Sequence, residues 1–560
     1  MMDATPDVVT VQLLRNRVAS LIEEMHYHLY RSGYSTIIRE SRDFSCAVTD
    51  HLGRIAVAPG LIIHCTIYRS LIAKILEIHG APGIQPGDVF VCNHPYEGGL
   101  AHASDMAVIA PVFSDERLVG FVGSIAHKPD IGGSVPGSVS GQSTELFQEG
   151  LLLPPVRLYL SGTPNEDLAR VIRANTRWPR LLMGDLDGQV GVVRMGAERI
   201  ANLCREFGVD IFTSAMDTVL SASEREFRAA IAGLPEETHE AEGFLDGDGV
   251  RPNQPVRFHA RVTHANGRLR FDLSGSDPQT TGPVSLRPPL VEACCFHALI
   301  GLLNPDLRFT DGARAIIEVI APEGSVVNAI SPAPASSYIG ACQKLIDVLL
   351  EAMGPFKPER AVANAGGSGG AIGMSWHEQK YRERGNQYEI LGSAYGASAS
   401  TDGCSGVTVH LSNLHAAPIE IIESEYPCRI ERFELLSGSG GSGRFRGGLG
   451  VRRRYRVLSP VTLIYRGDRA KVAPKGLRGG GNGAPSRLIL DPGTPREKQL
   501  PSSCRMELEA DSVVDICAAG GGGYGPPSER DPESIKSDVI NGYVLPAQAL
   551  RDYGVAIQRD

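Results

Sequence analysis

Apolar residues recur every three or four positions in several stretches of the chain, which is the spacing of α-helices with one or more buried faces. Helices are expected over residues 10–32, 66–79, most of 165–233, about 288–303 and about 338–353. The most apolar stretch, 289–303, is interrupted by Glu292 and His297. It is also shorter than the roughly 20 apolar residues that cross a bilayer. It is therefore interpreted as a helix buried in the protein core.

Other stretches alternate between apolar and polar residues or form short apolar runs, and both patterns favour β-strands. Strands are expected over residues 45–49, 54–58 and several segments of 240–285. Residues 106–113 and 118–126 are two apolar runs joined by a short polar segment, which predicts a β-hairpin. The Gly/Ser/Pro-rich stretch 132–141 is expected to be a loop.

Shifts in composition divide the chain into three expected parts. Residues 1–235 form an N-terminal α/β part with the candidate metal site, residues 236–362 a central α+β part, and residues 363–560 a Gly-rich, β-dominated part. A chain of 560 residues has room for about three or four structural units. The predicted fold class is therefore mixed α/β (α+β) and multidomain.

Charge and cysteine usage narrow the possible partners and location. Lys and Arg number 55 against 64 Asp and Glu, which gives a net charge of −9. An acidic chain repels nucleic acid and anionic lipid, so neither is expected as a partner. The basic run Arg452–Arg454 is interpreted as a solvated strand face.

The 11 cysteines include no Cys-x-x-Cys pair, and residues 1–15 resemble no secretion signal. Reduced thiols and a cytoplasmic location are therefore expected.

Side chains of the metal-ligand type crowd the ends of the predicted hairpin. If the hairpin turns through a two-residue loop at 115–116, the numbers of two facing residues add up to 231. Ser104 then faces His127. His102 is then a diagonal neighbour of His127 on the same sheet face, at about 7–8 Å. Asp105 falls on the opposite face, and it joins them only if the chain is still turning there or a β-bulge shifts the register by one. The candidates in this region are Asn93, His94, Tyr96, His102, Asp105, His127 and Asp130.

Two imidazoles and one carboxylate leave coordination positions open for water or substrate, which is typical of a catalytic metal site. This ligand set suits Zn, Mn or Fe about equally well. The alternative interpretation is that His102, Asp105 and His127 are separate surface or core-edge residues, one of them an ordinary cap.

Other features give weaker indications. A carboxylate in the segment 40–46 lies at a strand entrance and can act as a general base, although pairing with Arg42 is the commoner role. Glu149 is expected in a short helix, with capping or solvent exposure as its default role. The glycine runs 437–448 and 520–525 lack the Gly-Lys-Ser/Thr ending of a phosphate-binding loop. They are interpreted as tight turns.

A set of motifs in a fixed order makes the sequence similar to the B subunit of the hydantoinase/oxoprolinase family. The motifs are Arg42-Asp43-Phe44-Ser45-Cys46, Asn93-His94-Pro95-Tyr96-Glu97-Gly98-Gly99 followed by His102 and Asp105, His127-Lys128-Pro129-Asp130-Ile131-Gly132-Gly133, Gln148-Glu149-Gly150-Leu151, Gly184-Asp185-Leu186, Ser274-Gly275-Ser276, Pro322-Glu323-Gly324-Ser325, Glu425-Tyr426-Pro427-Cys428-Arg429-Ile430-Glu431-Arg432, Gly443-Arg444-Phe445-Arg446-Gly447-Gly448 and Gly520 to Tyr524.

The resemblance implies one subunit of an ATP-dependent enzyme that opens cyclic amides such as hydantoins, lactams and 5-oxoproline. It also implies that ATP and Mg bind to a partner A subunit, in agreement with the missing phosphate loop. In related ketone carboxylases the equivalent chain holds a metal through His, Asp and His, at positions that match His102, Asp105 and His127. Two positions depart from the family pattern: His94 replaces an Asp and Lys128 replaces a second His.

The expected function is hydrolysis of a cyclic amide by metal-activated water after the partner has phosphorylated the amide oxygen. Asp43, Asp130 and Glu149 are the candidate proton acceptors, and the sequence does not rank them. The expected partners are an A-type subunit, in a hetero-oligomer, and a small cyclic amide. Two alternatives stay open: a subunit of an ATP-dependent ketone carboxylase, and a non-catalytic scaffold of such a complex.

Overall fold

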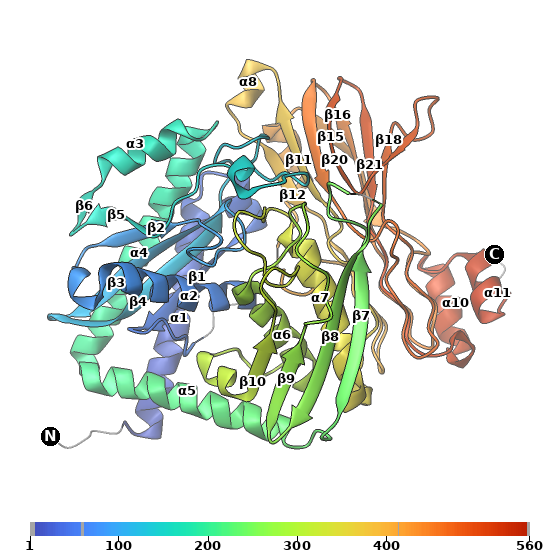
Figure 1. The fold of residues 1–560 in the computed structure, drawn as a ribbon. Coiled ribbons are helices and arrows are strands. Elements are labelled where there is room, and N and C mark those ends of the chain that lie inside the picture. Colours follow the sequence, from blue (N-terminus) through green and yellow to red (C-terminus); the bar gives the residue numbers. More distant parts are fainter. Residues whose placement is uncertain (1–5, 58–60, 252, 413, 557–560) are drawn as a thin grey trace.

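A computed structural model describes residues 6–57, 61–251, 253–412 and 414–556, and it confirms a mixed α/β chain of several parts (Figure 1). The N-terminal part is an antiparallel sheet of six strands in the order β1-β4-β3-β2-β5-β6. These are β1 (Phe44–Asp50), β2 (Val89–Cys92), β3 (Asp105–Ser114), β4 (Arg117–His127), β5 (Val156–Leu160) and β6 (Thr163–Pro164). Its helices are α1 (Val8–Ser32), α2 (Ile62–His79), α3 (Glu166–Ala174), α4 (Pro179–Phe207) and α5 (Val209–Ile231). The predicted hairpin is confirmed as β3–β4.

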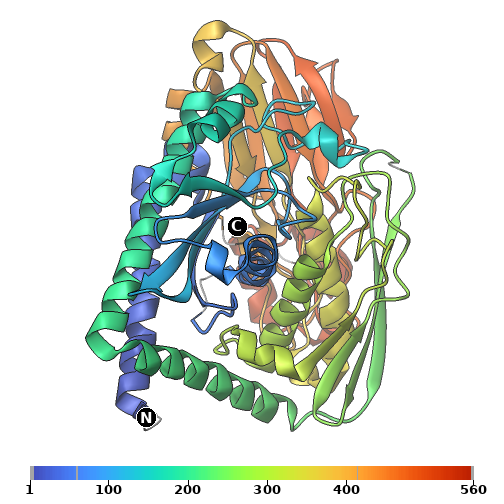
Figure 2. The same cartoon turned by 60° about the vertical axis from the view of Figure 1, so that its left-hand side comes forward.

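Both faces of this sheet are buried, which explains the nearly continuous apolar runs of β3 and β4. Met106 and Val108 of β3 belong to a core shared with α1, α4 and α5. Ala107 and Ile109 point the other way, into a core shared with α2 and the central part. Figure 2 shows α1 and α4 running side by side along the sheet, with α5 crossing their lower ends.

The central part packs two helices against a four-stranded sheet of order β10-β9-β8-β7, in which β10 runs parallel to β9. Its elements are β7 (Thr238–Leu245), β8 (Val256–Ala265), β9 (Arg268–Asp272), α6 (Pro288–Leu303), β10 (Ile317–Ile320) and α7 (Tyr338–Met353). The expected helices at 288–303 and 338–353 are confirmed. One hydrophobic core joins this part to the first sheet, and the boundaries at 235 and 362 stay predictions.

The C-terminal part is β-rich, as expected, and its two larger sheets share one core. One sheet has the order β12-β11-β17-β20, the other β15-β16-β21-β18-β19, and β13 pairs with β14. The strands are β11 (Ala371–Trp376), β12 (Gln387–Ile390), β13 (Ser393–Ala394), β14 (Ser405–Val407), β15 (Cys428–Leu435), β16 (Val451–Val457), β17 (Val461–Arg466), β18 (Arg487–Leu490), β19 (Lys498–Leu500), β20 (Ser503–Leu508) and β21 (Val513–Cys517). Two short helices, α8 (Gln379–Arg382) and α9 (Ile419–Glu425), lie between strands.

Short helical segments connect the longer elements. They are the π-helical turn η1 (Ile37–Ser41) and the 3₁₀ turns η2 (Ala81–Gly83), η3 (Leu146–Glu149), η4 (Asp311–Ile316), η5 (Gly354–Phe356), η6 (Pro358–Arg360) and η7 (Pro527–Glu529).

The glycine runs 437–448 and 520–525 pack backbone against backbone. A Cβ added at Gly447 would lie 1.9 Å from the Gly521 carbonyl oxygen, and one at Gly521 would lie 2.0 Å from the Tyr395 carbonyl oxygen. The Gly441 N–H donates to Gly521 O at 2.9 Å. Glycine is therefore required at these positions because neighbouring backbone segments approach closely. This packing explains the glycine runs without a phosphate-binding role.

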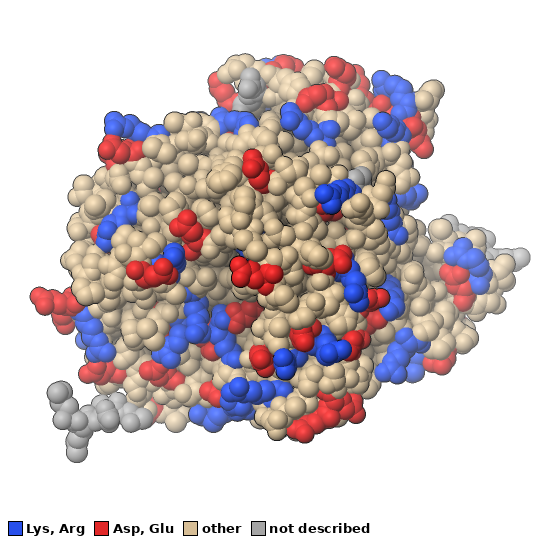
Figure 3. Space-filling model, viewed as in Figure 1, with Lys and Arg blue, Asp and Glu red and all other residues tan. Residues whose placement is uncertain are grey.

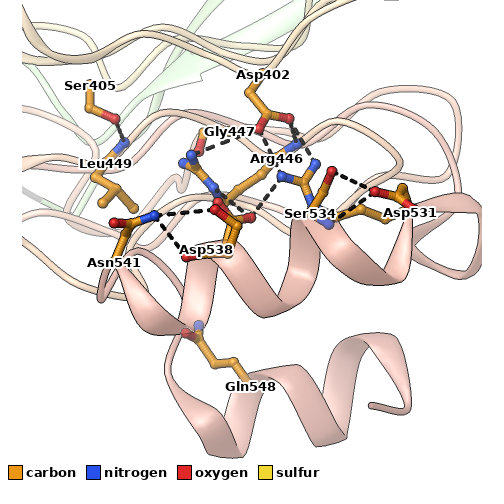
Figure 4. Close-up of polar contacts among 12 residues, drawn as sticks. Asp402, Ser405, Arg446, Gly447, Leu449, Asp531, Ser534, Asp538, Asn541 and Gln548 are labelled. Atoms are coloured by element: carbon orange, nitrogen blue, oxygen red, sulfur yellow. Dashed lines mark hydrogen bonds and ion pairs between the residues drawn. The ribbon is translucent and has the colours of Figure 1, made fainter. Parts of the chain in front are cut away.

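A helical hairpin of α10 (Pro532–Ile540) and α11 (Pro546–Tyr553) projects from the C-terminal sheets (Figure 1). Arg530 holds it by donating to both carboxylate oxygens of Asp402 at 2.8 Å and to Asp538 of α10 at 2.7 Å. Arg446 adds a bond to Asp538 at 3.4 Å (Figure 4). The hairpin is thus attached by a buried network of charges.

Two expectations about local structure are wrong. Residues 54–57 form no strand, and residue 58 lies outside the described residues. The run Arg452–Arg454 is not a solvated face, because Arg453 is fully buried and pairs with Glu389 at 3.2 Å. Its neighbours on either side both pair with Asp515.

The surface mixes charges of both signs. Lys and Arg are interspersed with Asp and Glu on the face shown in Figure 3. Within the described ranges no helix has the length and apolar character needed to cross a membrane. No disulfide joins any of the eleven cysteines, all of which are described.

Candidate metal centre

Three buried side chains meet at the open end of the β3–β4 hairpin. His102 comes from the turn before β3, Asp105 is the first residue of β3 and His127 is the last residue of β4. His102 Nε2 lies 3.0 Å from Asp105 Oδ1 and 3.2 Å from His127 Nδ1, and His127 Nδ1 lies 3.3 Å from Asp105 Oδ1. Each residue is only 3% exposed. The trio that the sequence singled out is therefore brought together.

The register of the hairpin differs from that of a regular two-residue turn without a bulge. This difference brings Asp105 onto the same side of the sheet as His127. The tight turn pairs Ser114 with Arg117, as predicted, but the register shifts between Val112 and Phe113. Val119 is the extra residue of the bulge and has no partner in the register. Beyond it, the residue numbers of each facing pair add up to 232 instead of 231, so Asp105 directly faces His127. Ser104 does not face His127, and the β-bulge considered as an alternative is the arrangement found.

Asn93 organises the turn that carries His102. Its side-chain amide donates to the Ala103 carbonyl at 2.7 Å and to the Leu151 carbonyl at 2.8 Å, and its Oδ1 accepts from Leu153 N at 2.6 Å. The residue is fully buried. Asn93, a candidate ligand by side-chain type, thus fixes the backbone beside the trio.

The trio fits one divalent cation. Two ligand atoms about 2.1 Å from an ion and roughly 90–110° apart are separated by about 3.0–3.4 Å, which matches the three distances above. Asp105 Oδ2 is buried without a hydrogen-bond partner. Although burial alone would raise it, the neighbouring imidazoles of His102 and His127 hold the pKa of Asp105 well below its usual range. The carboxylate is therefore available as an anionic ligand.

Asp43 lies at the edge of the trio and is partly open to solvent. Its Oδ2 is 4.0 Å from His127 Nδ1, and its side chain is 20% exposed. Its backbone carbonyl accepts from His127 N at 3.1 Å, which fixes its position relative to the hairpin. Burial raises the pKa of Asp43 to about 6; the nearby Asp105 carboxylate raises it as well, while His127 opposes the shift. Asp43 is the only one of the three sequence-predicted proton acceptors that forms an ion pair with the trio.

Asp130 and Glu149 serve elsewhere. Asp130 is fully buried, accepts from Gly132 N, Gly137 N and Arg177 N, and pairs with the Arg177 guanidinium at 2.8 Å. Such a fully engaged carboxylate orders the loop that follows the hairpin. Glu149 is buried rather than solvent-facing, so that expectation is wrong, and its Oε1 accepts from two backbone amides at 2.9 Å each. Burial raises the pKa of Glu149 to about 7.

Two tyrosines from distant parts of the chain form aromatic walls. The Tyr338 ring, at the start of α7, lies 5.1 Å from the His102 ring. The Tyr388 ring, in β12, stacks on His127 with centroids 5.1 Å apart. Sequence reasoning missed both, because no local motif links them to a hairpin more than 200 positions earlier in the chain.

His64 of α2 is a further neighbour that the sequence did not single out. Its Nδ1 lies 2.8 Å from Ser45 Oγ in β1. Burial lowers the pKa of His64 to about 4, so the imidazole is neutral near pH 7. It adds a polar wall without adding charge.

The two departures from the family pattern have structural explanations. His94 Nδ1 accepts from the backbone N–H groups of Tyr96 and Glu97 at 3.2 Å, which caps the turn there. Lys128 is fully buried and donates to Gln189 of α4. Burial lowers the pKa of Lys128 to about 8. Neither residue displaces a member of the trio.

Comparison with known proteins now decides the family. The family model described as hydantoinase B/oxoprolinase matches residues 7–527. The chain belongs to this family. A protein of Pseudomonas sp. (strain NS671), provisionally named as the B subunit of a D-/L-hydantoinase, is 32% identical over 98% of this chain and 95% of its own length.

Two solved structures share the fold of this family member. The crystal structure of ATP-dependent caprolactamase from Pseudomonas jessenii superposes with a TM-score of 0.91 at 25% identity, covering 99% of this chain and 97% of that one. A nucleotide-free acetone carboxylase structure gives a TM-score of 0.89 at 20% identity, over 99% of this chain and 80% of that one. The second likeness concerns the fold alone.

Proposed function

We propose that this chain is the B subunit of an ATP-dependent hydrolase of cyclic amides, of the hydantoinase, 5-oxoprolinase or lactamase type. Membership of the hydantoinase B/oxoprolinase family supports the reaction class. The observation that carries the proposal is the buried triangle of His102, Asp105 and His127, whose three ligand atoms are mutually within 3.0–3.3 Å. These residues would hold a divalent Zn, Mn or Fe ion.

A cation held by these residues would supply Lewis-acid chemistry and would lower the pKa of water towards neutral pH. Asp43 would accept a proton from the attacking water; the 4.0 Å distance from its Oδ2 to His127 Nδ1 and the 20% exposure of its side chain support this role. Tyr338 and Tyr388 cover the imidazole rings and exclude bulk water from the ligand atoms. Proton transfer is therefore directed to one carboxylate.

Amide resonance makes a lactam carbonyl a poor electrophile, so ring opening needs activation. We infer that phosphorylation of the amide oxygen takes place on a partner A subunit that binds ATP and Mg. This division agrees with the absence of a phosphate-loop motif from this sequence. It also agrees with the names of two relatives, the B subunit of a hydantoinase and the beta subunit of a caprolactamase. The absence of disulfides is consistent with a cytoplasmic location.

The test uses the chain purified with its A-type partner and analysed for bound metal and ATP-dependent ring opening. We expect His102→Ala to remove the metal and abolish turnover. His94 caps a turn nearby, and His94→Ala is expected to keep both metal and turnover. A His102→Ala complex that retains full turnover would show that the chain is a scaffold. The isolated chain is expected to bind metal and no ATP, and ATP hydrolysis by it alone would contradict the division of labour.

An ATP-dependent ketone carboxylase remains the second candidate, because acetone carboxylase shares the fold. Labelled bicarbonate separates the two reactions. A hydrolase incorporates no carbon from bicarbonate into its product, whereas a carboxylase must do so.

A further inference from the structure

A large cavity is connected to the turn that carries His102 through Arg287, which lines the cavity and donates to the carbonyl of Ala101. Its volume is about 820 Å³, it opens to solvent, and it is lined by α2, by the loop 95–99 and by the start of α6. Small and apolar side chains such as Ala73, Val291 and Val319 form much of its wall. The cavity has room for a small organic molecule as well as an ion.

Arg287, at the start of α6, lines this cavity and carries a charge that nothing neutralises directly. It is 2% exposed, and its Nε has no hydrogen-bond partner. Its terminal nitrogens donate to the carbonyls of Ala101 and Ser285. Within the described residues no carboxylate forms an ion pair with it. Glu149 acts on it only through its longer-range charge.

The other cations around the cavity are already compensated. Arg69 pairs with Asp311 at 2.9 Å, and Arg314 pairs with Asp311 and Glu292. Buried arginines elsewhere are paired as well: Arg453 with Glu389 and Arg469 with Asp347. Burial of a guanidinium without a counter-ion is costly, so its retention at a cavity wall points to an anion that completes the pair.

Arg287 is also linked to the metal-binding turn. It donates to the carbonyl of Ala101, the residue immediately before His102. Tyr96 lies under its guanidinium, 5.7 Å from the ring centre, and donates its hydroxyl to the Ala333 carbonyl at 2.7 Å. The guanidinium is therefore held in place from several sides, while its Nε edge stays unused.

We propose that this cavity is an oxyanion-binding site in which Arg287 receives a carboxylate or phosphate group. The planar guanidinium is suited to either oxyanion. Because the inference rests on the proposed function for its choice of ligand, two sources are considered: the carboxylate of an acidic cyclic amide, and phosphate released from ATP. The link to Ala101 places either anion next to the turn that carries His102.

Binding to the 560-residue chain, measured by titration calorimetry, tests this site without relying on turnover. The probes are 5-oxoproline, 2-pyrrolidone (the same ring without the carboxylate) and inorganic phosphate. We expect at least one oxyanion to bind about tenfold or more tightly than 2-pyrrolidone. Preference for 5-oxoproline assigns the site to substrate, and preference for phosphate assigns it to the product of ATP use. Equal binding of all three, or none, would overturn the proposal on the unmodified protein.

Variants locate the binding. Arg287→Gln is expected to weaken binding of the preferred oxyanion by about tenfold or more. Asp311 already neutralises the charge of Arg69, so Arg69→Gln should change the affinity by less than about threefold. His102→Ala should keep the affinity while losing metal, so failure of the metal centre and failure of this site are distinguishable. An unchanged affinity in Arg287→Gln, or its loss in His102→Ala, would place the anion elsewhere.

Discussion

The ring of Tyr388 lies parallel to the ring of His127, with 7° between their planes. Its hydroxyl accepts from the Arg466 guanidinium at 2.9 Å, which links the ring to β17. A residue of the β-rich C-terminal part therefore packs on a candidate metal ligand that belongs to the N-terminal sheet. Mutation of residues that orient a metal-binding imidazole typically costs about 10–100-fold in metal affinity or activity.

Removal of this ring should weaken the metal centre. Tyr388→Leu is expected to lower metal affinity by about tenfold, because His127 loses the surface that fixes its orientation. Tyr388→Phe keeps the stacked ring and should keep the affinity. Competition with a chelator of known affinity measures both. Equal affinities of the Leu and Phe variants would mean that stacking does not position His127.

Loss of the proposed proton acceptor should separate chemistry from metal binding. Asp43→Asn is expected to keep the metal and to reduce ring opening by about 10²–10⁴-fold, because an amide accepts no proton. Metal content and ATP-dependent turnover of the complex are the two measurements. Asp167→Asn, on the exposed side of α3, is the control and should match the unmodified protein. Undiminished turnover of Asp43→Asn would remove Asp43 from the mechanism.

Glu149 should make the protein less stable as pH rises. Burial raises its pKa from 4.5 to about 7, so between these pH values the folded state binds more protons than the unfolded state. The free energy of unfolding therefore falls by up to about 3 kcal/mol across that window, relative to a variant without the carboxyl group. Urea unfolding at several pH values, compared with Glu149→Gln, measures the difference. Parallel pH profiles for the two proteins would contradict this prediction.

Attachment of the helical hairpin should depend on Arg530. Arg530→Met leaves the buried Asp538 carboxylate with one cation fewer, which costs about 3 kcal/mol of local stability. Hydrogen exchange should then accelerate in α10 and α11 and remain unchanged in the β3–β4 hairpin. Arg551→Met, which removes an exposed pair with Asp552, is the control and should leave exchange unchanged. Equal exchange rates in both variants would show that apolar contacts hold the hairpin.

Local patterns predicted the longer helices, the β3–β4 hairpin and the β-rich character of the C-terminal part, but not its individual strands, nor every register or contact. Helices such as α6 and α7 follow from apolar spacing, and the β3–β4 hairpin from two apolar runs around a polar turn. The one-residue shift at Val119 could not be derived, because both faces of the sheet are buried and the apolar pattern fits either register. The placement of Asp105 therefore depended on the resemblance and on the structure.

Roles that depend on distant contacts were beyond sequence reasoning. Asp130 and Asp43 look alike as carboxylates near a motif, yet one is saturated by hydrogen bonds from the loop after β4 and from Arg177 while the other opens beside His127. Tyr338 and Tyr388 reach the site only through the packing of three parts of the chain. The interpretation of Arg452–Arg454 as a solvated face was wrong for the same reason, since their partners Asp515 and Glu389 lie far away in sequence.

The origin of the two aromatic walls also sets an order of events during synthesis. All three ligands leave the ribosome early, while Tyr338 and Tyr388 emerge more than 200 codons later. A nascent chain that ends between the hairpin and α7 would carry the complete ligand set with its imidazole rings uncovered. If a cation binds the trio at that stage, loading would precede enclosure, because the two aromatic walls are added only with α7 and β12.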